Sequence, residues 1–417
     1  MIKFHPPQPA KDVEHAVVYR RENECATHPF SRGFWETAAG HLICNFSVAT
    51  VDYSGDPNNL AHHRLIHNPG GRRGVTVRSE DRGRTWYVFN EDKNRPGMDV
   101  KAPEPGVDGK PGSLSEIGPI NFLNKDVLVS NFYYQYMQED PQIRDFVRTV
   151  TTEFGPPENQ VFVRISKDGG LTWSRSIMLP LNGLYSLSAV ESSLVRPDGR
   201  CLLFLTGGTK KEGEHNRFPA GPEHGEPNRP LVYRSSDDGT SFHFMSFITP
   251  ENDGTLGGRR RMYPRGVMLP NGRILCFLRV ERDWAGVMWT EVFKSDDGGR
   301  TWQFLSRATD FGAPGSPVVM SDGRVVLVYT YRLPPRGMRA VVSEDGGETW
   351  GPEIVIRDDA GSWDIGYPRT WEVEPGKIGT IYYYNDKDDP IQVKPAPGSL
   401  WGEGGVRYIA RSIFSVD

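Results

Sequence analysis

Short apolar runs recur along the chain, each preceded by a turn that contains glycine, asparagine or aspartate. An apolar run after such a turn is typical of the second strand of a β-hairpin. Six segments have this form: Ala38–Cys44, Leu123–Val129, Pro197–Phe204, Pro270–Phe277, Ser321–Val328 and Glu374–Ile381. No uninterrupted apolar stretch with helical spacing accompanies them, so the pattern predicts an all-β protein.

A second repeat follows five of the six hairpins. This turn, here called the Asp box, reads Ser-x-Asp-x-Gly-x-Thr-Trp with small variations at 79–86, 166–173, 235–242, 295–302 and 343–350. Its Asp side chain accepts backbone hydrogen bonds, its Gly takes a positive φ, and its aromatic ring packs beneath. The box resembles half of a calcium loop but lacks the bidentate Glu. We therefore expect structural turns that bury Trp86, Trp173, Trp302 and Trp350.

The hairpins and boxes define six units, of which the last lacks one strand. After its hairpin only the run Arg407–Phe414 remains, whereas His15–Arg20 near the other end has no partner of its own. Pairing these two segments closes a ring and covers an exposed edge. The sequence therefore predicts a six-bladed β-propeller of four-stranded antiparallel blades, closed by an N-terminal strand that joins the last blade. We expect one domain over residues 1–417, with 1–13 as an N-terminal extension.

Strand parity assigns the loops to the two faces of this propeller. The hairpin turns and the Asp boxes fall on one face, and the strand 2–3 loops and the connections between blades fall on the other. Long insertions at roughly 46–73, 134–159 and 207–230 belong to the second face. Long loops carry function more often than tight turns do, so we expect the functional site on that face.

Composition and charge narrow the class of protein. The chain has 46 Gly, 33 Pro and 11% aromatic residues, which suits many short strands joined by tight turns. A net charge of −4 gives no electrostatic reason to expect nucleic acid or a membrane surface as a partner. The N-terminus lacks the apolar core of a signal peptide, and no segment is long enough to span a bilayer.

Cysteine usage favours a reducing compartment. Cys44, Cys201 and Cys276 occupy similar places in three of the apolar runs. We therefore expect buried thiols rather than disulfides or metal ligands. Together with the missing signal peptide, this usage predicts a cytoplasmic protein. Neither a nucleotide fingerprint nor a Cys/His zinc spacing is present, so we expect no cofactor and no metal.

The residues just before the first strand of each unit are expected to line a central pocket. Alignment on the turn glycines places these residues at comparable positions: Ser31 or Arg32, Glu116, Glu191, Tyr263, Gly315 and Tyr367. Glu116 and Glu191 stand among small and apolar residues, where an ionised carboxylate is costly unless it is paired. They either pair with arginines between blades or form the carboxylate pair of a glycoside-cleaving site. We expect the second role.

Cations and aromatic groups are expected around the same mouth. Guanidinium groups bind oxyanions in bidentate fashion, so an Arg cluster suits a carboxylate or a sulfate. Ordinary surface charge is the alternative for part of this set. His62 lies in the loop Ala61–His67 and is either a solvated loop residue or a general acid or base. The substrate-binding candidates are Arg32, Arg73, His62, Tyr263, Arg265, Arg279, Arg336, Arg339, Arg369 and Trp284.

These motifs resemble, over nearly the whole chain, the sialidase (neuraminidase) superfamily of Asp-box propellers. The resemblance implies a Tyr nucleophile paired with a Glu, an Asp acid/base, and three Arg residues that hold a substrate carboxylate. The segment Ile365–Tyr382 is similar to the family's nucleophile strand, which gives Tyr367 the nucleophile role. Arg279 is similar to the second Arg of the family, and either Arg336 or Arg339 to the third.

Three positions depart from the family pattern. The first-blade motif Arg-Ile-Pro appears only as Ser-Arg-Gly-Phe around Arg32. Arg73 stands where the family has its acid/base Asp, and Tyr263 stands where it has the Glu partner. We expect Glu116 and Glu191 to replace them, in an arrangement similar to that of exo-arabinanases.

The sequence thus predicts an exo-acting glycoside hydrolase that removes a terminal, acidic sugar from a glycan. Its catalytic residues are expected to be Tyr367, Glu191 and Glu116. Two alternatives remain open: a polysaccharide lyase that acts on a uronate with a Tyr or His base, and a non-catalytic glycan-binding propeller. The partner is a carbohydrate in each case, and the sequence gives no indication of the oligomeric state.

Overall fold

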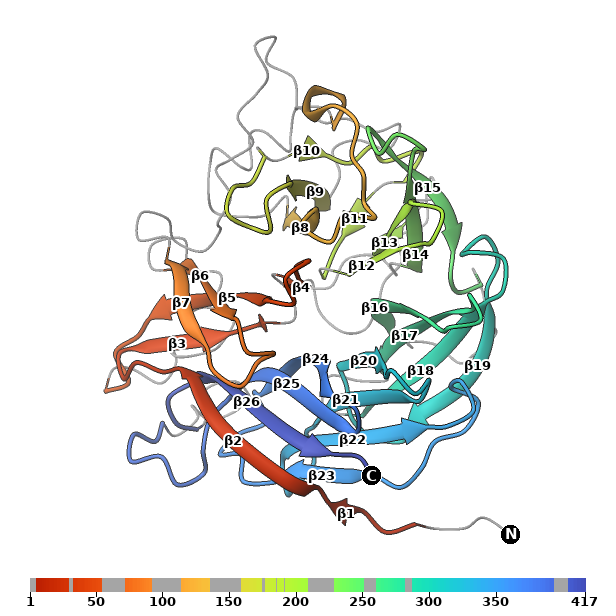
Figure 1. The fold of residues 1–417 in the computed structure, drawn as a ribbon. Coiled ribbons are helices and arrows are strands. Elements are labelled where there is room, and N and C mark those ends of the chain that lie inside the picture. Colours follow the sequence, from red (N-terminus) through yellow and green to blue (C-terminus); the bar gives the residue numbers. More distant parts are fainter. Residues whose placement is uncertain are drawn as a thin grey trace, which may run out of the picture.

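Six small antiparallel β-sheets are arranged in a ring around a central axis (Figure 1). The computed structural model describes residues 5–29, 33–54, 72–91, 114–135, 159–174, 177–184, 186–190, 192–208, 229–250, 260–281, 287–393 and 404–417. Regular structure in these ranges is almost entirely β-strand. The fold is a six-bladed β-propeller, as predicted.

The first three blades lie between residues 24 and 247. Blade 1 contains β3 (Glu24–Thr27), β4 (Phe34–Glu36), β5 (Leu42–Thr50), β6 (Arg72–Ser79) and β7 (Tyr87–Glu91). Blade 2 contains β8 (Leu128–Gln135), β9 (Asn159–Ser166) and β10 (Ile177–Met178), preceded by the 3-10 helix η2 (Leu114–Ile117). Blade 3 contains β11 (Ser186–Ser188), β12 (Ser193–Val195), β13 (Cys201–Gly208), β14 (Arg229–Ser235) and β15 (Phe242–Phe247).

The other three blades complete the ring. Blade 4 contains β16 (Arg260–Met268), β17 (Ile274–Glu281), β18 (Met288–Ser295) and β19 (Gln303–Thr309). Blade 5 contains β20 (Gly315–Val319), β21 (Val325–Tyr331), β22 (Gly337–Ser343), β23 (Ile354–Arg357) and the short β1 (Gln8–Pro9). Blade 6 contains β24 (Gly366–Glu374), β25 (Lys377–Tyr384), β26 (Tyr408–Ser415) and β2 (Lys11–Tyr19).

Strand β2 closes the ring by joining the last blade, which confirms the prediction. It pairs antiparallel with β26, and Lys11 lies opposite Ser415. Residues before β2 also form a contact that the sequence did not predict, because β1 pairs in parallel with β23. Gln8 lies opposite Ile354 in this pair. The extension thereby covers the outer edge of blade 5, an edge that would otherwise present unpaired backbone groups.

The inner strands are less regular than four-stranded blades require. In blade 2 the described residues form three strands, and the segment expected to be the innermost strand contains η2. Gly118 there has a φ of 77°, and Pro119 has no N–H to donate to a ladder. In blades 1 and 3 the inner position is shared by two short strands, β3 with β4 and β11 with β12. These breaks occur where the inner strands approach the axis (Figure 1).

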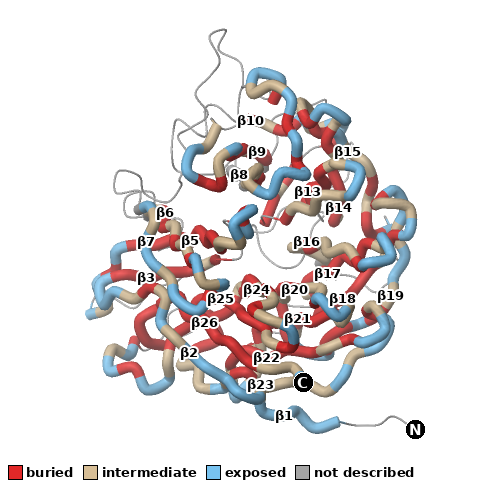
Figure 2. The backbone as a smooth tube through the Cα atoms, viewed as in Figure 1, coloured by how far each residue is buried: buried red, intermediate tan, exposed pale blue. Residues whose placement is uncertain are grey.

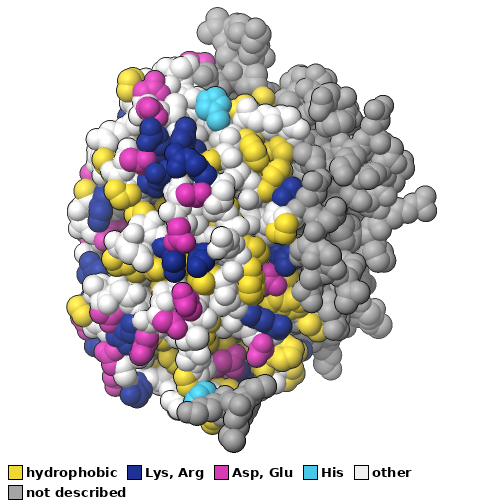
Figure 3. Space-filling model, turned by 90° about the vertical axis from the view of Figure 1, so that its right-hand side faces the viewer, with side chains coloured by type: hydrophobic (Ala, Val, Ile, Leu, Met, Phe, Trp, Pro, Cys, Tyr) yellow, Lys and Arg dark blue, Asp and Glu magenta, His cyan; other side chains and the backbone are white. Residues whose placement is uncertain are grey.

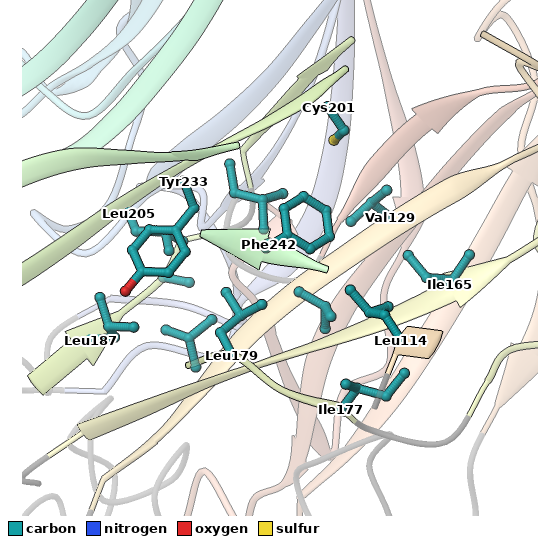
Figure 4. Close-up of a cluster of buried hydrophobic side chains, with 14 of the residues drawn as sticks. Leu114, Val129, Ile165, Ile177, Leu179, Leu187, Cys201, Leu205, Tyr233 and Phe242 are labelled. Carbon is teal, nitrogen blue, oxygen red and sulfur yellow. The ribbon is translucent and has the colours of Figure 1, made fainter. Parts of the chain in front are cut away.

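The hydrophobic core lies between neighbouring blades, because each sheet buries side chains on both faces (Figure 2). Separate clusters join blades 2 and 3, 3 and 4, 4 and 5, 5 and 6, and 6 and 1. In the first of these, Val129 and Ile165 from blade 2 pack with Leu205 and Tyr233 from blade 3 (Figure 4). Each fully buried side chain of this size contributes about 1.5–3 kcal/mol, so the clusters fix how neighbouring blades meet.

The Asp boxes have the predicted turn hydrogen bonds. In the blade 4 box, Asp297 accepts hydrogen bonds from the Thr301 hydroxyl at 2.6 Å and from the Thr301 N–H at 2.9 Å. Trp302 is half-buried, and its indole N–H donates to the Ser246 hydroxyl of blade 3 at 3.1 Å. The other box tryptophans, Trp86, Trp173 and Trp350, are also half-buried. The expectation of full burial was wrong, because these rings lie at the rim, where they bridge to the preceding blade.

The outer surface mixes both charges. On the side shown in Figure 3, Lys and Arg side chains lie beside Asp and Glu. Two examples at the box turns are Arg273 with Asp296 and Arg200 with Asp237, each at 2.7 Å. Exposed pairs of this kind contribute little to stability. In the part of the chain that the structure describes, no helix has the length and apolar character needed to cross a membrane.

Candidate active site

Three inner strands leave their regular ladder at the same point. The last regular pairs before the break are Thr27–Ser47 in blade 1, Met262–Arg279 in blade 4 and Gly366–Tyr383 in blade 6. The next residues, His28, Tyr263 and Tyr367, have positive φ angles of 62°, 57° and 51°. Each is followed by a proline, which cannot donate a ladder hydrogen bond. The breaks therefore release three ring side chains at one level of the propeller.

The three rings meet around Tyr367. Its ring centroid lies 4.9 Å from that of His28, in an edge-to-face arrangement, and 6.0 Å from that of Tyr263. Tyr383 of the neighbouring strand lies 6.0 Å away. His28, Tyr263 and Tyr367 are half-buried, whereas the prolines behind them are buried. Blades 1, 4 and 6, which supply these rings, surround the central axis (Figure 1), so the site lies near the axis. Tyr367 is the second residue of β24, at the end of that strand away from the hairpin turn.

Arg279 approaches Tyr367 from blade 4. Its Nη1 donates to the Tyr367 hydroxyl at 3.3 Å, and its guanidinium lies 5.3 Å from the centre of the Tyr263 ring. Glu281 holds the other side of the guanidinium at 3.3 Å. Burial alone would lower the pKa of Arg279, but the Glu281 carboxylate and the Tyr367 and Tyr263 hydroxyl groups together outweigh burial and raise it above its ordinary value. Arg279 therefore stays charged at the axis.

Arg332 approaches from blade 5, just after β21. Its guanidinium lies 4.1 Å from the centre of the Trp363 ring and 5.7 Å from that of Tyr367. Its Nη2 donates to the Ile365 carbonyl at 3.2 Å. The Nε atoms of Arg332 and Arg279 are both buried and make no hydrogen bond to any described residue. Two incompletely paired guanidinium groups thus border one tyrosine, which is the arrangement that an anionic ligand requires.

A buried ion pair supports the rings from behind. Asp364 accepts hydrogen bonds from the Tyr383 hydroxyl at 2.5 Å and from Arg407 Nε at 2.9 Å. The side chains of Asp364 and Arg407 are only 1% and 2% exposed. Tyr383 packs against both Tyr367 and His28, with a centroid separation of 5.6 Å from His28. The ion pair therefore fixes the ring on which two residues of the site rest.

Of the residues predicted from the sequence, the structure brings Tyr367, Tyr263 and Arg279 together. Arg265 and Arg369 follow the two Tyr-Pro pairs and are buried within their strands. The Nε of Arg369 donates to the Pro29 carbonyl at 3.4 Å, so this side chain ties blade 6 to the residue after His28.

Other predicted arginines are engaged in their own blades. Arg339 pairs with the Glu353 carboxylate, and its guanidinium lies 3.3 Å from the centre of the Tyr331 ring. Arg73 pairs with Glu24 at 2.6 Å. Arg336 is half-buried on the turn before β22, where its carbonyl accepts a hydrogen bond from the Ala360 N–H at 3.2 Å.

Glu116 lies apart from this cluster. It is exposed in η2, and the carbonyl of the adjacent Ile117 accepts a hydrogen bond from Lys167, a residue of the blade 2 Asp box, at 3.0 Å. The Ile120 N–H donates to the carbonyl of Asp238 in the blade 3 box at 2.9 Å, so the described part of this segment lies against the box turns. The expectation that Glu116 lines the central pocket is not supported by this placement. The candidates Glu191, Arg32, His62 and Trp284 lie outside the described residues.

Sequence reasoning missed His28 and left Arg332 unassigned. Counting back from the hairpin glycine placed Ser31 and Arg32 at the blade 1 position, but strand register places His28 there, equivalent to Tyr263 and Tyr367. The signal was an aromatic or imidazole residue followed by proline in all three strands. Arg332 was one of several arginines near the end of β21, and only the fold distinguishes them.

The described residues contain no group of three or more His, Cys, Asp and Glu side chains placed to hold a metal. All four cysteines are buried thiols, as expected for the three that lie in the apolar runs. Arg279 and Arg332 are suited to bind a carboxylate, Tyr367 and Tyr263 provide phenol groups, and His28 provides an imidazole that can move a proton.

Sequence comparison finds similarity to a family profile and to a curated sialidase. The profile of the BNR repeat-like domain family matches residues 251–380. A sialidase of Micromonospora viridifaciens is 27% identical over 218 residues, which cover 49% of this chain and 33% of the sialidase. The chain therefore spans about a third of the length of this curated relative.

Solved structures share the fold over almost the whole chain. A Dyadobacter fermentans protein of unknown function has a TM-score of 0.65 and 20% identity, covering 98% of this chain and 99% of its own. A Hadza microbial sialidase has a TM-score of 0.56 and 16% identity, covering 96% of this chain and 68% of its own. A Penicillium chrysogenum α-L-arabinanase complexed with arabinobiose has a TM-score of 0.54 and 12% identity, covering 96% and 97%.

Proposed function

Since the chain is a sialidase-like propeller of BNR repeats, we propose that it is a glycoside hydrolase that removes a terminal, carboxylate-bearing sugar from a glycan. One observation carries this proposal: Arg279 and Arg332 converge on Tyr367 at the axis, on the face opposite the Asp boxes. Two buried cations with unused donors beside a half-exposed phenol suit an anionic sugar.

The proposed roles follow from the contacts. Arg279 and Arg332 hold the sugar carboxylate. The Tyr367 oxygen, next to Arg279, faces the anomeric carbon as positive charge develops there in the transition state. Tyr263 and His28 form the walls on either blade. Glu191 remains the carboxylate that the sequence assigns to the nucleophile or base side, and its part is tested below.

The named relatives point to two different sugars. Sialic acid, the sugar that a sialidase removes, carries a carboxylate, whereas arabinose does not. The arginine pair favours the acidic sugar, because a neutral sugar would add no anionic partner to the buried guanidinium of Arg332, whose Nε makes no hydrogen bond to any described residue. We therefore place sialic acid and uronic acids ahead of arabinose as the terminal sugar.

A panel of chromogenic glycosides tests the proposal. Aryl glycosides of sialic acid, glucuronic acid and arabinose are offered to the wild type and to Tyr367→Phe, Arg279→Met and Glu191→Gln. We expect turnover of an acidic glycoside, lost by about 10²-fold or more in Tyr367→Phe and Arg279→Met. Tyr87→Phe is the control, because Tyr87 is 47% exposed on β7 and donates to Glu80 at 2.8 Å. Preference for the arabinoside, unchanged by Arg279→Met, would contradict the proposal.

One observation favours a second function, eliminative cleavage of a uronate. The position at which the family resemblance implies a Glu partner carries Tyr263, and the ring against Tyr367 on the other side is an imidazole. Eliminative cleavage removes the proton on the carbon next to the uronate carboxylate. This step needs a Tyr or His base and an Arg that neutralises the carboxylate. The products distinguish the two reactions, because elimination leaves a carbon–carbon double bond that absorbs ultraviolet light and hydrolysis does not. Binding of acidic sugars without either product would support a glycan-binding propeller instead.

A further inference from the structure

We propose that His28 is the acid/base residue of this site, a role that rests on the proposed hydrolysis of an acidic glycoside. The residue has no counterpart in the positions that the family resemblance assigns to proton transfer. The assignment of His28 to this role is based on its position in the fold and on the residues around it.

The backbone at His28 is held in an uncommon conformation. Its φ of 62° is matched by Tyr263 and Tyr367, so three of the six described non-glycine residues with positive φ belong to this one site. Such a conformation is unfavourable for a non-glycine residue and persists where the surrounding structure enforces it, most often at functional positions. The three equivalent breaks therefore place an imidazole and two phenols on the same pocket.

The position of the imidazole is well defined. Its ring packs edge-to-face on Tyr367 at 4.9 Å and against Tyr383 at 5.6 Å. The carbonyl of the next residue, Pro29, accepts a hydrogen bond from Arg369 at 3.4 Å. His28 is nevertheless half-buried rather than buried, so part of it remains accessible. A fixed and partly accessible imidazole beside Tyr367 is suited to proton transfer.

The described carboxylates near Tyr367 are already committed to arginines. Glu281 pairs with Arg279 at 3.3 Å, and Asp364 pairs with Arg407 at 2.9 Å behind Tyr383. Protonating either one would leave a buried guanidinium without its counter-charge, which is costly. Neither carboxylate is therefore suited to transfer a proton in this site.

The charges around His28 favour protonation of its imidazole when an anionic substrate binds. Among the described residues, several titratable and charged groups lie near His28, either directly or behind the Tyr367 and Tyr383 rings. They are Tyr367, Tyr383, Tyr263, Arg369, Arg279, Arg332 and Asp364. The nearby arginines disfavour a third positive charge in the empty site. A sugar carboxylate bound to Arg279 and Arg332 offsets their charge and so favours the imidazolium. Substrate binding thereby prepares the acid.

The proton balance of the reaction closes on His28. As the glycosidic C–O bond breaks, its electron pair stays on the leaving oxygen, which takes the proton of the His28 imidazolium. Water then adds to the anomeric carbon and returns one proton to the neutral imidazole. The products are two hydroxyl-bearing sugars, and His28 ends protonated as it began.

The leaving group provides a test that a purely structural role would not satisfy. Nitrophenyl and methyl glycosides of sialic acid and glucuronic acid are compared with the wild type and His28→Gln. A nitrophenolate leaves without help, whereas an alkoxide needs the acid. We expect kcat/KM of His28→Gln to fall about 10²–10⁴-fold for the methyl glycoside and far less for the nitrophenyl one, with loss of one limb of the pH profile. His243→Gln is the matched control, because His243 is exposed on β15.

The outcomes separate this role from the proposed function. Turnover that falls equally for both leaving groups, or an unchanged pH profile, overturns the role of His28 and leaves the hydrolase intact. No turnover of any acidic glycoside by the wild type overturns the hydrolase and this role with it. If His28→Gln does not fold, the imidazole NMR signal of wild-type His28 replaces it. We expect this signal to shift when sialic acid or glucuronic acid binds, and a signal that stays fixed while the sugar binds overturns the role.

Discussion

Replacing Asp364 by Asn is expected to destabilise the propeller strongly while changing little of its shape. The Asp364 carboxylate accepts from Tyr383 at 2.5 Å and from Arg407 at 2.9 Å, with both members of the ion pair almost fully buried. Burial alone would lower the pKa of Arg407, but the Asp364 carboxylate, together with Cys25 and Tyr53, outweighs burial and raises that pKa above its ordinary value. Asp364→Asn removes the carboxylate that pairs with this buried cation.

The expected loss of stability follows from the loss of this buried ion pair. Removing one partner of a buried pair costs about 3–5 kcal/mol, because the remaining ion stays desolvated. The Tyr383 hydroxyl can still donate to the amide oxygen of Asn, so we expect the lower end of this range. The loss is a large fraction of the stability of a typical protein, which is about 5–15 kcal/mol.

Urea unfolding of the wild type and the variant measures this loss as a difference in the free energy of unfolding. The matched control is Glu374→Gln, which also removes an ion pair of blade 6. Glu374 pairs with Arg84 at 2.7 Å, but the two side chains are 41% and 46% exposed. We expect no measurable change for this exposed pair. Equal effects of the two substitutions, or a loss below about 1 kcal/mol for Asp364→Asn, would refute the reasoning.

Three further predictions concern the site, the boxes and the thiols. Arg332→Met should weaken binding of sialic or glucuronic acid by about 10-fold or more in calorimetric titration, since a charge-assisted hydrogen bond contributes about 1.5–3 kcal/mol; unchanged affinity would remove Arg332 from the site. Although partial burial opposes it, hydrogen bonds from Thr301 and Ser295 lower the pKa of Asp297 to about 2. The stability that the Asp297 carboxylate contributes should therefore be complete above its unfolded pKa of about 3.9 and be lost as the pH falls towards 2. The melting temperature of Asp297→Asn should decrease less across this pH window than that of the wild type. An identical decrease would contradict the assignment. Burial raises the pKa of Cys25 to about 12 and that of Cys276 well above its ordinary value. A thiol reagent should therefore label no cysteine in the native protein and all four after unfolding, and rapid native labelling would contradict this.

Much of the fold could be predicted because its signals are local. The box at 295–302 specifies its own turn through Asp297, and the hairpin glycines mark where each second strand begins. Ring closure followed from counting strands. The pairing of β1 with β23 could not be found in this way, because parallel pairing of two residues depends only on which edge happens to be open.

The site was harder to predict because it depends on register at the axis. Tyr263 and Tyr367 lie within the continuous inner strands β16 and β24, so counting back from the hairpin located them. His28 was missed because Thr27 pairs with Ser47 and Phe34 with Cys44, so more residues separate β3 from β4 than a regular register allows and the count is shifted. Glu116 failed for a related reason, since Gly118 and Pro119 replace a regular inner strand. Irregularity at the axis, where function is expected, thus defeats an alignment based on regular blades.

The pairing of β2 with β26 sets the order in which the protein can assemble during its synthesis. Residues 11–19 emerge from the ribosome early but must wait for residues 408–415 before their sheet exists. Until then the buried surfaces of blades 1 and 5 that face blade 6 lack their cover, and contacts so distant in sequence form slowly. Nascent chains should therefore depend on chaperones up to the last blade, and Tyr367, which belongs to that blade, is the last part of the pocket to be put in place.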